Sequence, residues 1–448
     1  MELNRSVLIK NATVVTMDDA LGVLHNCDIL IEGDVIAKIG TTITSNDAEL
    51  IDATTSIVCP GFIDTHRHTW QTQLRTVCTD DSLADYFAHI RNTLAPCYTA
   101  DDVYWGNYVG ALESLNAGIT YLVDHSHVNI TPDHADAAVR GLRDAGIRGT
   151  YCYGTFENPP HPTIKVDIPT GDWRRDDARR IREKYFSEPG LLRFGLAPKE
   201  VEMMEITDIA EDIRFAREIG AELITGHIAV GRREGGRRTL KELSSTGALS
   251  SDILLSHGSG LTDEELTIIH DHKISLSTTP ETELQMGMGH PVAFRAKEHG
   301  CTASLGMDIV SNVPVDMFAQ MRLLLQAQRQ HDFDKFGRSA QLKGKTADVL
   351  HMATIGGAEA VNLQSEIGSI SVGKKADLII ISTKDIGMTP WKDPLGLIVL
   401  YAHPSHVDTV FVGGKVMKRD GKLIGVNWEE VRANLVKSSE AIFQRSHT

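Results

Sequence analysis

Apolar runs of strand length alternate with amphipathic stretches of helical length through the middle of this 448-residue chain. Eight such runs follow one another, which is the rhythm of repeated strand–helix units. Eight units predict an α/β fold in which parallel strands close into a (β/α)8 TIM barrel inside a ring of helices. The predicted strands are residues 57–66, 119–127, 149–157, 191–199, 221–229, 251–259, 273–281 and 301–309.

Helix start and stop signals lie between these runs, as such a barrel requires. Residues 99–102 (TADD) and 262–265 (TDEE) resemble capping boxes at the start of a helix. Gly118, Gly146 and Gly220 follow helical stretches, at the position where glycine commonly ends a helix. These signals support the alternation of strands and helices.

A different pattern occupies the two ends of the chain. Residues 7–58 contain short strand-like stretches separated by Asn, Asp and Gly, which favour hairpin turns. The same pattern of short strand-like stretches and turn residues recurs at residues 368–383 and 407–425. We therefore predict a small β-sandwich domain built from both chain ends, residues 1–57 and 364–448, and a barrel of residues 58–363.

Charge and cysteine content exclude several kinds of partner and site. A formal net charge of −15 argues against nucleic acid or an anionic membrane as partner. No apolar run approaches the roughly 20 residues that span a bilayer, and the first residues lack a signal-peptide pattern. The six cysteines form no C-x-x-C pair, which suits a reduced compartment. We expect a cytoplasmic protein in which any metal is held by histidine and carboxylate.

Two histidines end the first predicted strand, in the stretch GFIDTHRHTW (61–70). Side chains alternate along a strand with a period of two, so His66 and His68 point to the same side. In a barrel of this kind the functional groups gather at the carboxyl ends of the strands. The polar residues at the predicted strand ends are His66, His68, His125, His127, Lys199, His227, His257, Glu281 and Asp308.

Four of these residues form the ligand set of a divalent metal ion. We predict that His66, His68, His227 and Asp308 hold one ion, Zn2+ or else Fe2+ or Mn2+, and leave a position for water. Asp308 would also accept a proton from that water, and His257 would orient the water or polarise a substrate. A lone histidine is more often a hydrogen-bonded core residue. Packing alone does not explain four such groups at one end of a barrel.

Several motifs along the chain belong together. They are PGFIDTHRH (60–68), the strand-end His227 and His257, LGMD (305–308) and GSISVGKKADL (368–378). Together these motifs resemble the amidohydrolase superfamily, and the resemblance covers essentially the whole chain. It implies metal-dependent hydrolysis at an unsaturated or carbonyl carbon, usually with cleavage of a C–N bond.

Three further stretches narrow this resemblance: HRHTWQTQLR (66–75), LSHGSGLTDEE (255–265) and HMATIGGAEA (351–360). They are similar to the cytosine deaminase and triazine hydrolase branch. Guanine deaminases of that branch carry a glutamine three residues after the second histidine, and the matching residue here is Gln71. The resemblance implies that Gln71 contacts the substrate and that the substrate is a small planar nitrogen heterocycle.

Two positions depart from that branch. Its deaminases carry a glutamate three residues after the strand-5 histidine, which moves a proton from water to the leaving nitrogen. Here that residue is Val230, which cannot carry a proton. After strand 4 the branch often has a substrate-contacting histidine, and this chain has Lys199. Lys199 is open to three interpretations: a surface lysine, a substrate-binding cation, or a carbamylated bridge between two metal ions.

Other residues near the strand ends have competing interpretations. Trp70 either stacks on a planar substrate or packs in the core. Glu281 contacts the substrate, replaces the missing proton shuttle, or is a solvated loop carboxylate. His125 and His127 either line the pocket or have a structural role. The basic run at residues 232–238 is predicted to be a solvated loop.

The sequence therefore predicts a metal-dependent hydrolase that attacks a C–N bond other than a peptide bond, by deamination or amide-type hydrolysis. Val230 keeps open a different bond preference, as in a lactam or amide hydrolase, a dechlorinase or a decarboxylase, with one ion or two. A catalytically silent interaction protein is a third possibility, against which the retained ligands argue. We expect a small-molecule substrate, no nucleic acid or membrane partner, and a homo-oligomer, either a dimer or a tetramer.

Overall fold

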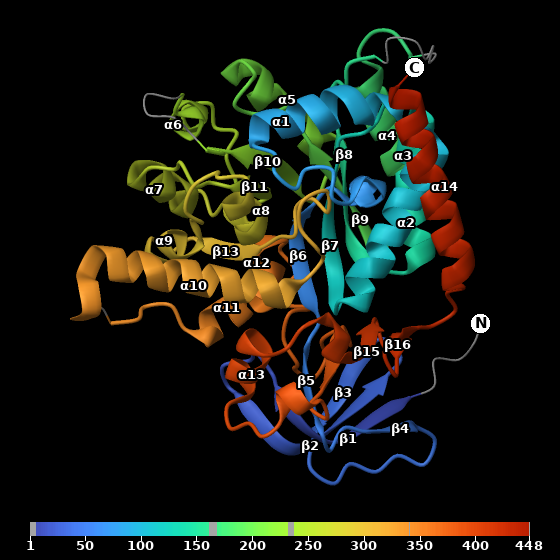
Figure 1. Ribbon diagram of the computed structural model, residues 1–448, viewed down its shortest axis with the longest axis vertical. Helices are drawn as coiled ribbons and strands as arrows, with labels where there is room; N and C mark the ends of the chain where they lie inside the picture. The colour runs from blue at the N-terminus through green and yellow to red at the C-terminus, as the bar shows by residue number, and fades with distance from the viewer. Residues whose placement is uncertain (1–5, 161–167, 232–236, 340, 448) are drawn as a thin grey trace. The chain divides into compact units, whose positions relative to one another are not determined.

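The computed structural model describes residues 6–160, 168–231, 237–339 and 341–447 (Figure 1). Residues 232–236 of the predicted basic loop therefore lie outside the described residues. The chain forms two compact units. The first comprises Met1–Asp64, Glu113–Tyr121 and Asp316–Gly425, and the second comprises Thr65–Leu112, Leu122–Val315 and Val426–Thr448.

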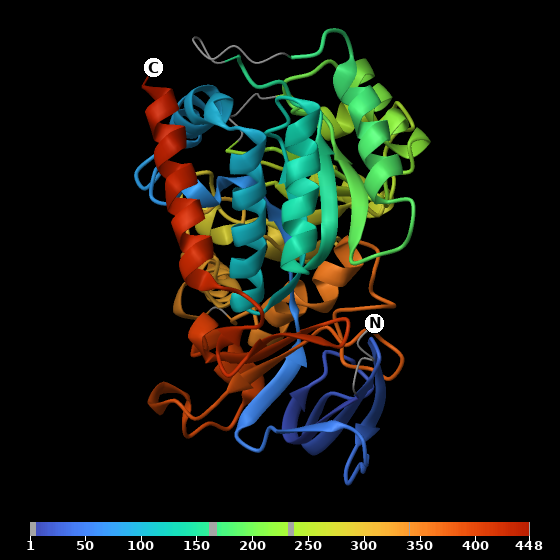
Figure 2. The same cartoon turned by 90° about the vertical axis from the view of Figure 1, so that its right-hand side faces the viewer.

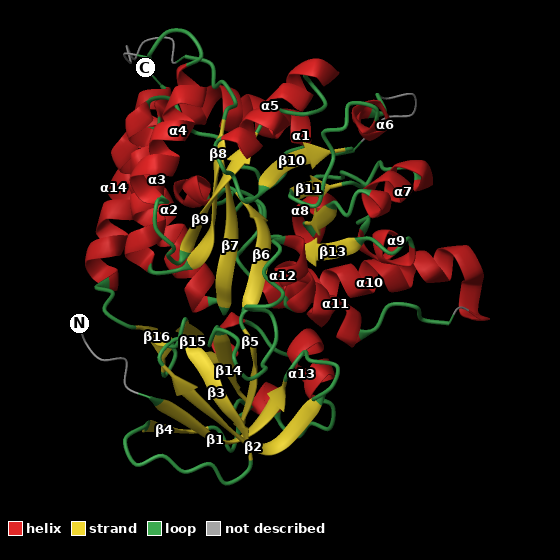
Figure 3. Cartoon of the chain, turned by 180° about the vertical axis from the view of Figure 1, so that it is seen from behind, coloured by secondary structure: helices red, strands yellow, loops and turns green. Residues whose placement is uncertain are grey.

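Eight strands form the barrel, and each one hydrogen-bonds to the next along the chain (Figure 3). Neighbours such as β10 and β11 run parallel, with His227 opposite Ser256. The predicted parallel α/β barrel is thus confirmed. The strands are β6 (Phe62–Arg67), β7 (Ile119–Ser126), β8 (Arg148–Gly154), β9 (Leu192–Ala197), β10 (Ile224–Ile228), β11 (Ile253–His257), β12 (Ser275–Thr278) and β13 (Thr302–Leu305).

The last strand of the barrel meets the first at its carboxyl end. Arg67 and Asp308 form an isolated parallel bridge. The backbone N–H of Asp308 donates to the carbonyl of His66 (2.8 Å), and the N–H of His68 donates to the carbonyl of Asp308 (2.9 Å). Gly306 lies against this seam, where a Cβ atom would come within 2.9 Å of the backbone nitrogen and oxygen of His66. Residues far apart in sequence are therefore joined at this seam.

Helices surround the barrel strands (Figure 3). A one-turn helix and three short irregular helices follow β6, and regular helices follow the later strands. They are η1 (Thr69–Leu74), α1 (Leu83–Tyr86), η2 (Phe87–Leu94), η3 (Ala95–Cys97), α2 (Ala100–Asn116), α3 (Pro132–Ala145), α4 (Trp173–Tyr185), α5 (Ile206–Glu218), α6 (Thr239–Ser244), α7 (Asp263–Asp271), α8 (Pro280–Gln285), α9 (Ala293–Glu298) and α14 (Trp428–Ser446).

Both predicted capping boxes are present. At the start of α7, Glu265 N–H donates to the Thr262 hydroxyl (3.2 Å), and Thr262 N–H donates to the Glu265 carboxylate (3.0 Å). Thr99 and Asp102 make the same exchange before α2. The glycines predicted to end helices have positive φ angles, of 88°, 74° and 76° at Gly118, Gly146 and Gly220. These local signals place the helices between the strands.

We expect Thr262→Ala to lower the free energy of unfolding by about 1 kcal/mol, because it leaves an N-terminal N–H of α7 without its side-chain acceptor. Thr267→Ala in the same helix is the matched control. Its exposed hydroxyl donates to the Asp263 carbonyl (3.0 Å). That carbonyl is already placed to accept a backbone N–H within the helix, so it does not depend on the hydroxyl. Urea denaturation followed by circular dichroism measures both variants. Equal losses in the two would contradict the capping role.

The other unit holds a nine-stranded sheet in the order β17-β16-β15-β14-β5-β1-β2-β3, with β4 paired to β1. The long strand β1 pairs with β4 through its first half and with β5 through its second half. Strands from both chain ends thus share one buried face, as predicted. The strands are β1 (Val7–Val15), β2 (Val23–Glu32), β3 (Val35–Gly40), β4 (Glu49–Asp52), β5 (Ser56–Pro60), β14 (Leu378–Ser382), β15 (Val407–Val412), β16 (Lys415–Arg419) and β17 (Lys422–Leu423).

The core of this sheet is aliphatic and draws on both ends of the chain. Ile9 and Ile29 of the N-terminal strands pack with Leu378 and Phe411 of the C-terminal strands. The helices of this unit are α10 (Met317–Phe336), η4 (Gly337–Ser339), α11 (Thr346–Ala353), α12 (Ile355–Ala360), η5 (Ile386–Met388), α13 (Pro394–Leu400) and η6 (Pro404–His406).

Three boundaries differ from the predicted ones. Residues 316–363, predicted with the barrel, belong to the unit that holds the nine-stranded sheet. The predicted strand 57–66 is divided at Gly61, so that β5 joins the nine-stranded sheet and β6 opens the barrel. Helix α14, predicted with the β domain, belongs to the barrel unit and runs beside α2 (Figure 2). Its Ser438 hydroxyl donates to Asp102 (2.6 Å), and its Arg445 guanidinium pairs with the same carboxylate. These polar contacts explain why the chain end returns to the barrel.

Candidate metal centre and active site

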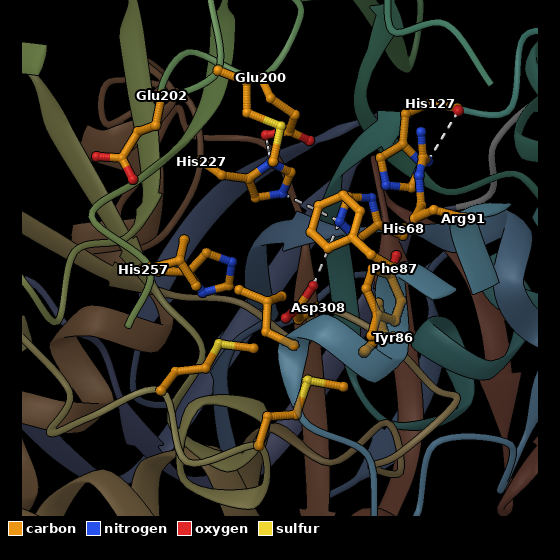
Figure 4. A pocket seen from close by; sticks show the side chains of 16 residues that line it. His68, Tyr86, Phe87, Arg91, His127, Glu200, Glu202, His227, His257 and Asp308 are labelled. Carbon is orange, nitrogen blue, oxygen red and sulfur yellow. Dashed lines mark hydrogen bonds and ion pairs between the residues drawn. The ribbon is translucent and has the colours of Figure 1, made fainter. Parts of the chain in front are cut away.

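Five side chains from the strand ends converge at the mouth of the barrel: His66, His68, His227, His257 and Asp308. Figure 4 shows His68, His227, His257 and Asp308. The Nε2 atoms of His68 and His227 lie 3.3 Å apart. Oδ1 of Asp308 lies 3.4 Å from Nε2 of His66 and 3.6 Å from Nε2 of His68. The ring of His257 stacks on that of His227, with centroids 5.5 Å apart. The structure therefore brings together all the residues predicted to bind metal or to act in catalysis.

Hydrogen bonds from outside this cluster fix how the imidazoles point. Nδ1 of His68 donates to the carbonyl of His125 (2.8 Å), and Nδ1 of His227 donates to the carboxylate of Glu200 (3.0 Å). Because each Nδ1 carries the hydrogen, each Nε2 carries a lone pair directed at the centre. A histidine that donates its second nitrogen to a carbonyl or carboxylate in this way is typical of metal sites.

The donor set fits a divalent cation. Ligand atoms of His66, His68 and His227 lie within 4.8 Å of one another, and so do those of His66, His257 and Asp308. Two lone pairs that face each other at 3.3 Å repel, and a positive charge between them removes that repulsion. Imidazole nitrogens with one carboxylate are donors that zinc and similar ions accept.

Burial sets the charge of these groups. Burial lowers the pKa of His66 to about 4 and holds the pKa of His68 well below its usual value, so both imidazoles are neutral. Burial alone would raise the pKa of Asp308, but the neighbouring imidazoles of His66 and His257 lower it overall. Neutral imidazoles and an ionised carboxylate are the forms that bind a metal ion.

His257 behaves differently from the other histidines. Its Nδ1 lies 3.1 Å from the hydroxyl of Thr279 and 3.4 Å from the carboxylate of Glu283. Burial alone would lower the pKa of His257, but Glu283 and Asp308 raise it overall. Both His257 (φ 74°) and Asp308 (φ 61°) have left-handed backbone, which is rare outside glycine and concentrates at active sites.

A pocket of about 780 Å³, part of it open to solvent, lies over this centre. Its acidic and cationic groups face a wall of apolar side chains. The lining residues are His68, Leu83, Tyr86, Phe87, Arg91, His127, Glu200, Glu202, Met203, His227, Val230, His257, Met286, Met288, Asp308 and Ile309.

The four predicted substrate contacts do not lie among the lining residues described. Trp70 is fully buried, and its Nε1 donates to His127 (3.1 Å). Gln71 is fully buried and donates to the Tyr86 hydroxyl (2.8 Å). Lys199 has a side chain 39% exposed, and its ammonium lies 3.6 Å from Glu157. Glu281 is half-buried on α8. The roles assigned to these residues remain predictions.

Three residues of the site were not predicted from the sequence. Glu200 directly follows Lys199 and orients His227. Glu283 lies two residues after Glu281, is fully buried, and faces His257. Arg91 lies in η2 and lines the pocket. Residues 200 and 283 were close to predicted positions, but no motif of the sequence pointed to residue 91.

Comparison with known proteins identifies the family to which the chain belongs. The amidohydrolase family model matches residues 57–417, so the chain belongs to the amidohydrolase family of hydrolytic enzymes, as its motifs predicted. It is 28% identical over 450 residues to a 5'-deoxyadenosine deaminase of Methanosarcina barkeri, across 98% of this chain and 99% of that one. It is 25% identical to a 5-methylthioadenosine/S-adenosylhomocysteine deaminase of Thermoanaerobacter pseudethanolicus, across 98% and 100%.

Solved structures share the fold. An adenosine deaminase from Xanthomonas campestris with bound zinc superposes with a TM-score of 0.84 at 20% identity, across 98% of both chains. An atrazine chlorohydrolase mutant from Arthrobacter aurescens, complexed with zinc and atraton, gives a TM-score of 0.85 at 20% identity, across 97% of this chain and 100% of that one. Among the described residues, no helix is both long and apolar enough to cross a membrane.

We expect Glu283→Gln to lower kcat roughly 10–100-fold, the usual effect of removing a charge that orients a catalytic or metal-binding imidazole. Glu281→Gln is the matched control on the same helix, and its kcat should change less than about threefold. Steady-state kinetics together with thermal melting separate loss of function from loss of fold. If Glu281→Gln is the more damaging change, the acid that serves the site is Glu281 and not Glu283.

Proposed function

We propose that this enzyme removes an amino group from a small planar nitrogen heterocycle, with one divalent ion held by His66, His68, His227 and Asp308. The observation that carries the proposal is the convergence of three imidazoles, two of them oriented by hydrogen bonds through Nδ1, and one carboxylate at the base of a pocket. The deaminase names of the full-length relatives support the same reaction type.

The reaction is a hydrolysis in which an amine and water give an oxo product and ammonia. A divalent ion bound at the centre would lower the pKa of a water ligand and polarise the carbon under attack. Asp308 accepts a proton from the attacking water, since neighbouring imidazoles keep its carboxylate ionised. His257, held by Glu283, donates a hydrogen bond to the charge that develops on the substrate.

The leaving nitrogen also needs a proton, and Val230 cannot supply it. Glu200 borders the pocket, but its carboxylate accepts the Nδ1 hydrogen of His227. We assign to Asp308, which has taken the proton from water, its return to the leaving nitrogen. His257 holds the developing charge during both transfers.

Val230 also supports a second candidate. A leaving group such as chloride departs without a proton, so an apolar residue in place of the usual glutamate suits dechlorination of a heterocycle. A triazine chlorohydrolase of the same fold is among the structural neighbours. The second candidate differs from the first only in the bond that breaks.

A substrate screen separates the two candidates. The metal-loaded protein is incubated with adenosine, 5'-deoxyadenosine, cytosine and guanine, with chlorinated triazines, and with cyclic amides. Ammonia release supports deamination, chloride release supports the second candidate, and ring opening of the cyclic amides supports an amide hydrolase. Absence of all three products, in protein that carries metal, would overturn the proposal.

The predicted dimer or tetramer and the cytoplasmic location belong to the same proposal. All six cysteines are buried and free, which is compatible with a reducing compartment. Light scattering during gel filtration measures the oligomeric state. A single species of about 49 kDa would contradict the predicted assembly.

A further inference from the structure

A buried cation lines the pocket. Arg91 is 1% exposed, yet it borders the same cavity as Asp308 and His257. It comes from η2, a wide-turned helix that follows the first barrel strand. In Figure 4 it lies on the His68 side of the pocket, across from His257 and Glu202. A guanidinium is charged at all ordinary pH values, so the pocket holds a permanent positive charge.

The protein satisfies this guanidinium only in part. Nη1 donates to the carbonyl of His127 (3.1 Å), and the plane of the group lies over the ring of Phe156, with Cζ 4.3 Å from the ring centroid. Nη2 is buried, and no described residue accepts a hydrogen bond from it. Buried donors are normally paired, and an unpaired one on a charged group is among the costliest to leave.

A second donor accompanies Arg91. Tyr86 lines the same pocket, and its hydroxyl accepts a hydrogen bond from Gln71 (2.8 Å), which leaves the hydroxyl its own hydrogen to give. Tyr86 and Arg91 lie in consecutive helices of one short segment, α1 and η2. Leu83 and Phe87 of that segment supply apolar wall. Two donors beside an apolar wall suit a flat ring that carries an oxygen acceptor.

We infer that Arg91, together with Tyr86, binds an oxygen acceptor on the substrate, so that the substrate is an oxo- or carboxy-substituted amino heterocycle. A guanidinium matches both a ring carbonyl and a carboxylate, because its N–H groups form a planar fork. The inference rests on the proposed function for the identity of the ring. It makes Arg91 a specificity-determining residue of this chain.

Matched pairs of probes test the inference on the full-length, metal-loaded protein. Guanine against 2-aminopurine isolates a ring carbonyl, and 2-aminopyrimidine-5-carboxylate against 2-aminopyrimidine isolates a carboxylate. Isothermal titration calorimetry should give a Kd about tenfold or more lower for the oxygenated member of one pair. The pair that shows the preference identifies whether the bound oxygen belongs to a ring carbonyl or to a carboxylate. Equal binding within both pairs, or no binding by any probe, would overturn the inference.

Variants at Arg91 locate the preference. Arg91→Lys keeps the charge but loses the planar fork, so most of the preference, measured as the ratio of the two Kd values within a pair, should disappear. Arg91→Met should behave in the same way, and Arg140→Met, in an exposed arginine of α3, is the matched control. A preference that survives in Arg91→Lys would assign it to another residue. If the variants fail to fold, the probe pairs measured on the wild-type protein still decide whether the oxygen preference exists.

Failure of this inference differs from failure of the proposed function. Hydrolysis of an amino heterocycle without any preference for oxygen refutes the role of Arg91 and leaves the proposed function intact. An oxygen preference that Arg91→Lys abolishes, in protein that hydrolyses none of the amines, supports the binding role and refutes deamination.

Discussion

Asp308→Asn should lower kcat by about 10²–10⁴-fold, the usual contribution of a general base, with an added loss from weaker metal binding. Asp308 is the carboxylate whose oxygen lies 3.4 and 3.6 Å from two of the proposed ligands, and neighbouring imidazoles keep it ionised. Steady-state kinetics measures the loss, and circular dichroism should find the fold intact because the backbone bonds to residues 66 and 68 remain.

Asp263→Asn, in an exposed residue at the start of α7, is the matched control for that charge change. It should leave kcat within about twofold. An Asp308→Asn enzyme that retains more than about a tenth of the wild-type kcat would show that another residue is the base.

Removal of metal should abolish activity. Because the donor atoms of His66, His68 and His227 lie within 4.8 Å of one another, the purified protein should hold about one equivalent of zinc, iron or manganese. His227→Ala should lose most of that metal, whereas His89→Ala, in an exposed histidine paired with Asp81, should keep it. Elemental analysis and activity after chelation measure both effects.

Two results would change this assignment. Fewer than roughly 0.2 equivalents of metal in active protein, with no loss of activity on chelation, would refute the metal centre. Two equivalents together with a carboxylated Lys199 would favour the binuclear alternative. The half-buried Lys199 has its ammonium 3.6 Å from Glu157, an ion pair that argues against that outcome.

Three of the five residues proposed for metal binding and catalysis could be grouped from strand geometry. The other two, His68 and Asp308, lie just beyond β6 and β13 and were indicated by the motifs at residues 60–68 and 305–308. His66, His227 and His257 lie within strands, and parallel strands bring their carboxyl ends to one edge. The period of two then fixes the direction of each side chain. Counting strands along the sequence was therefore enough to group residues that are far apart in the chain.

The substrate-facing residues could not be predicted in the same way, because they lie beyond the strands. After β9 the chain leaves the strand geometry at Pro198, so alternation no longer decides whether Lys199 or Glu200 turns inward. The same holds for Glu281 and Glu283, which lie on the short helix α8. Arg91 lies in an irregular helix, and no sequence motif predicts which of its side chains face the pocket.

The relatives and the structure constrain the substrate from two directions. The named relatives act on adenosine derivatives. In this pocket, by contrast, we infer that the buried guanidinium of Arg91 binds an oxygen acceptor on the substrate. Chains that share one fold commonly differ in the residues of the loops above the barrel. The probe pairs described for Arg91 therefore test whether this chain prefers a ring that carries an oxygen acceptor.

The seam between β6 and β13 has a consequence for how the protein is made. His66 and Asp308 are separated by roughly 240 residues, a distance over which loop closure costs substantial chain entropy. A partial chain that ends before residue 308 lacks one of the four proposed ligands. A nascent or truncated product of that length therefore carries the three histidine ligands but cannot assemble the proposed centre. The last ligand of the proposed centre is therefore supplied late in synthesis, and we expect proteolytic cleavage that frees β13 to abolish activity.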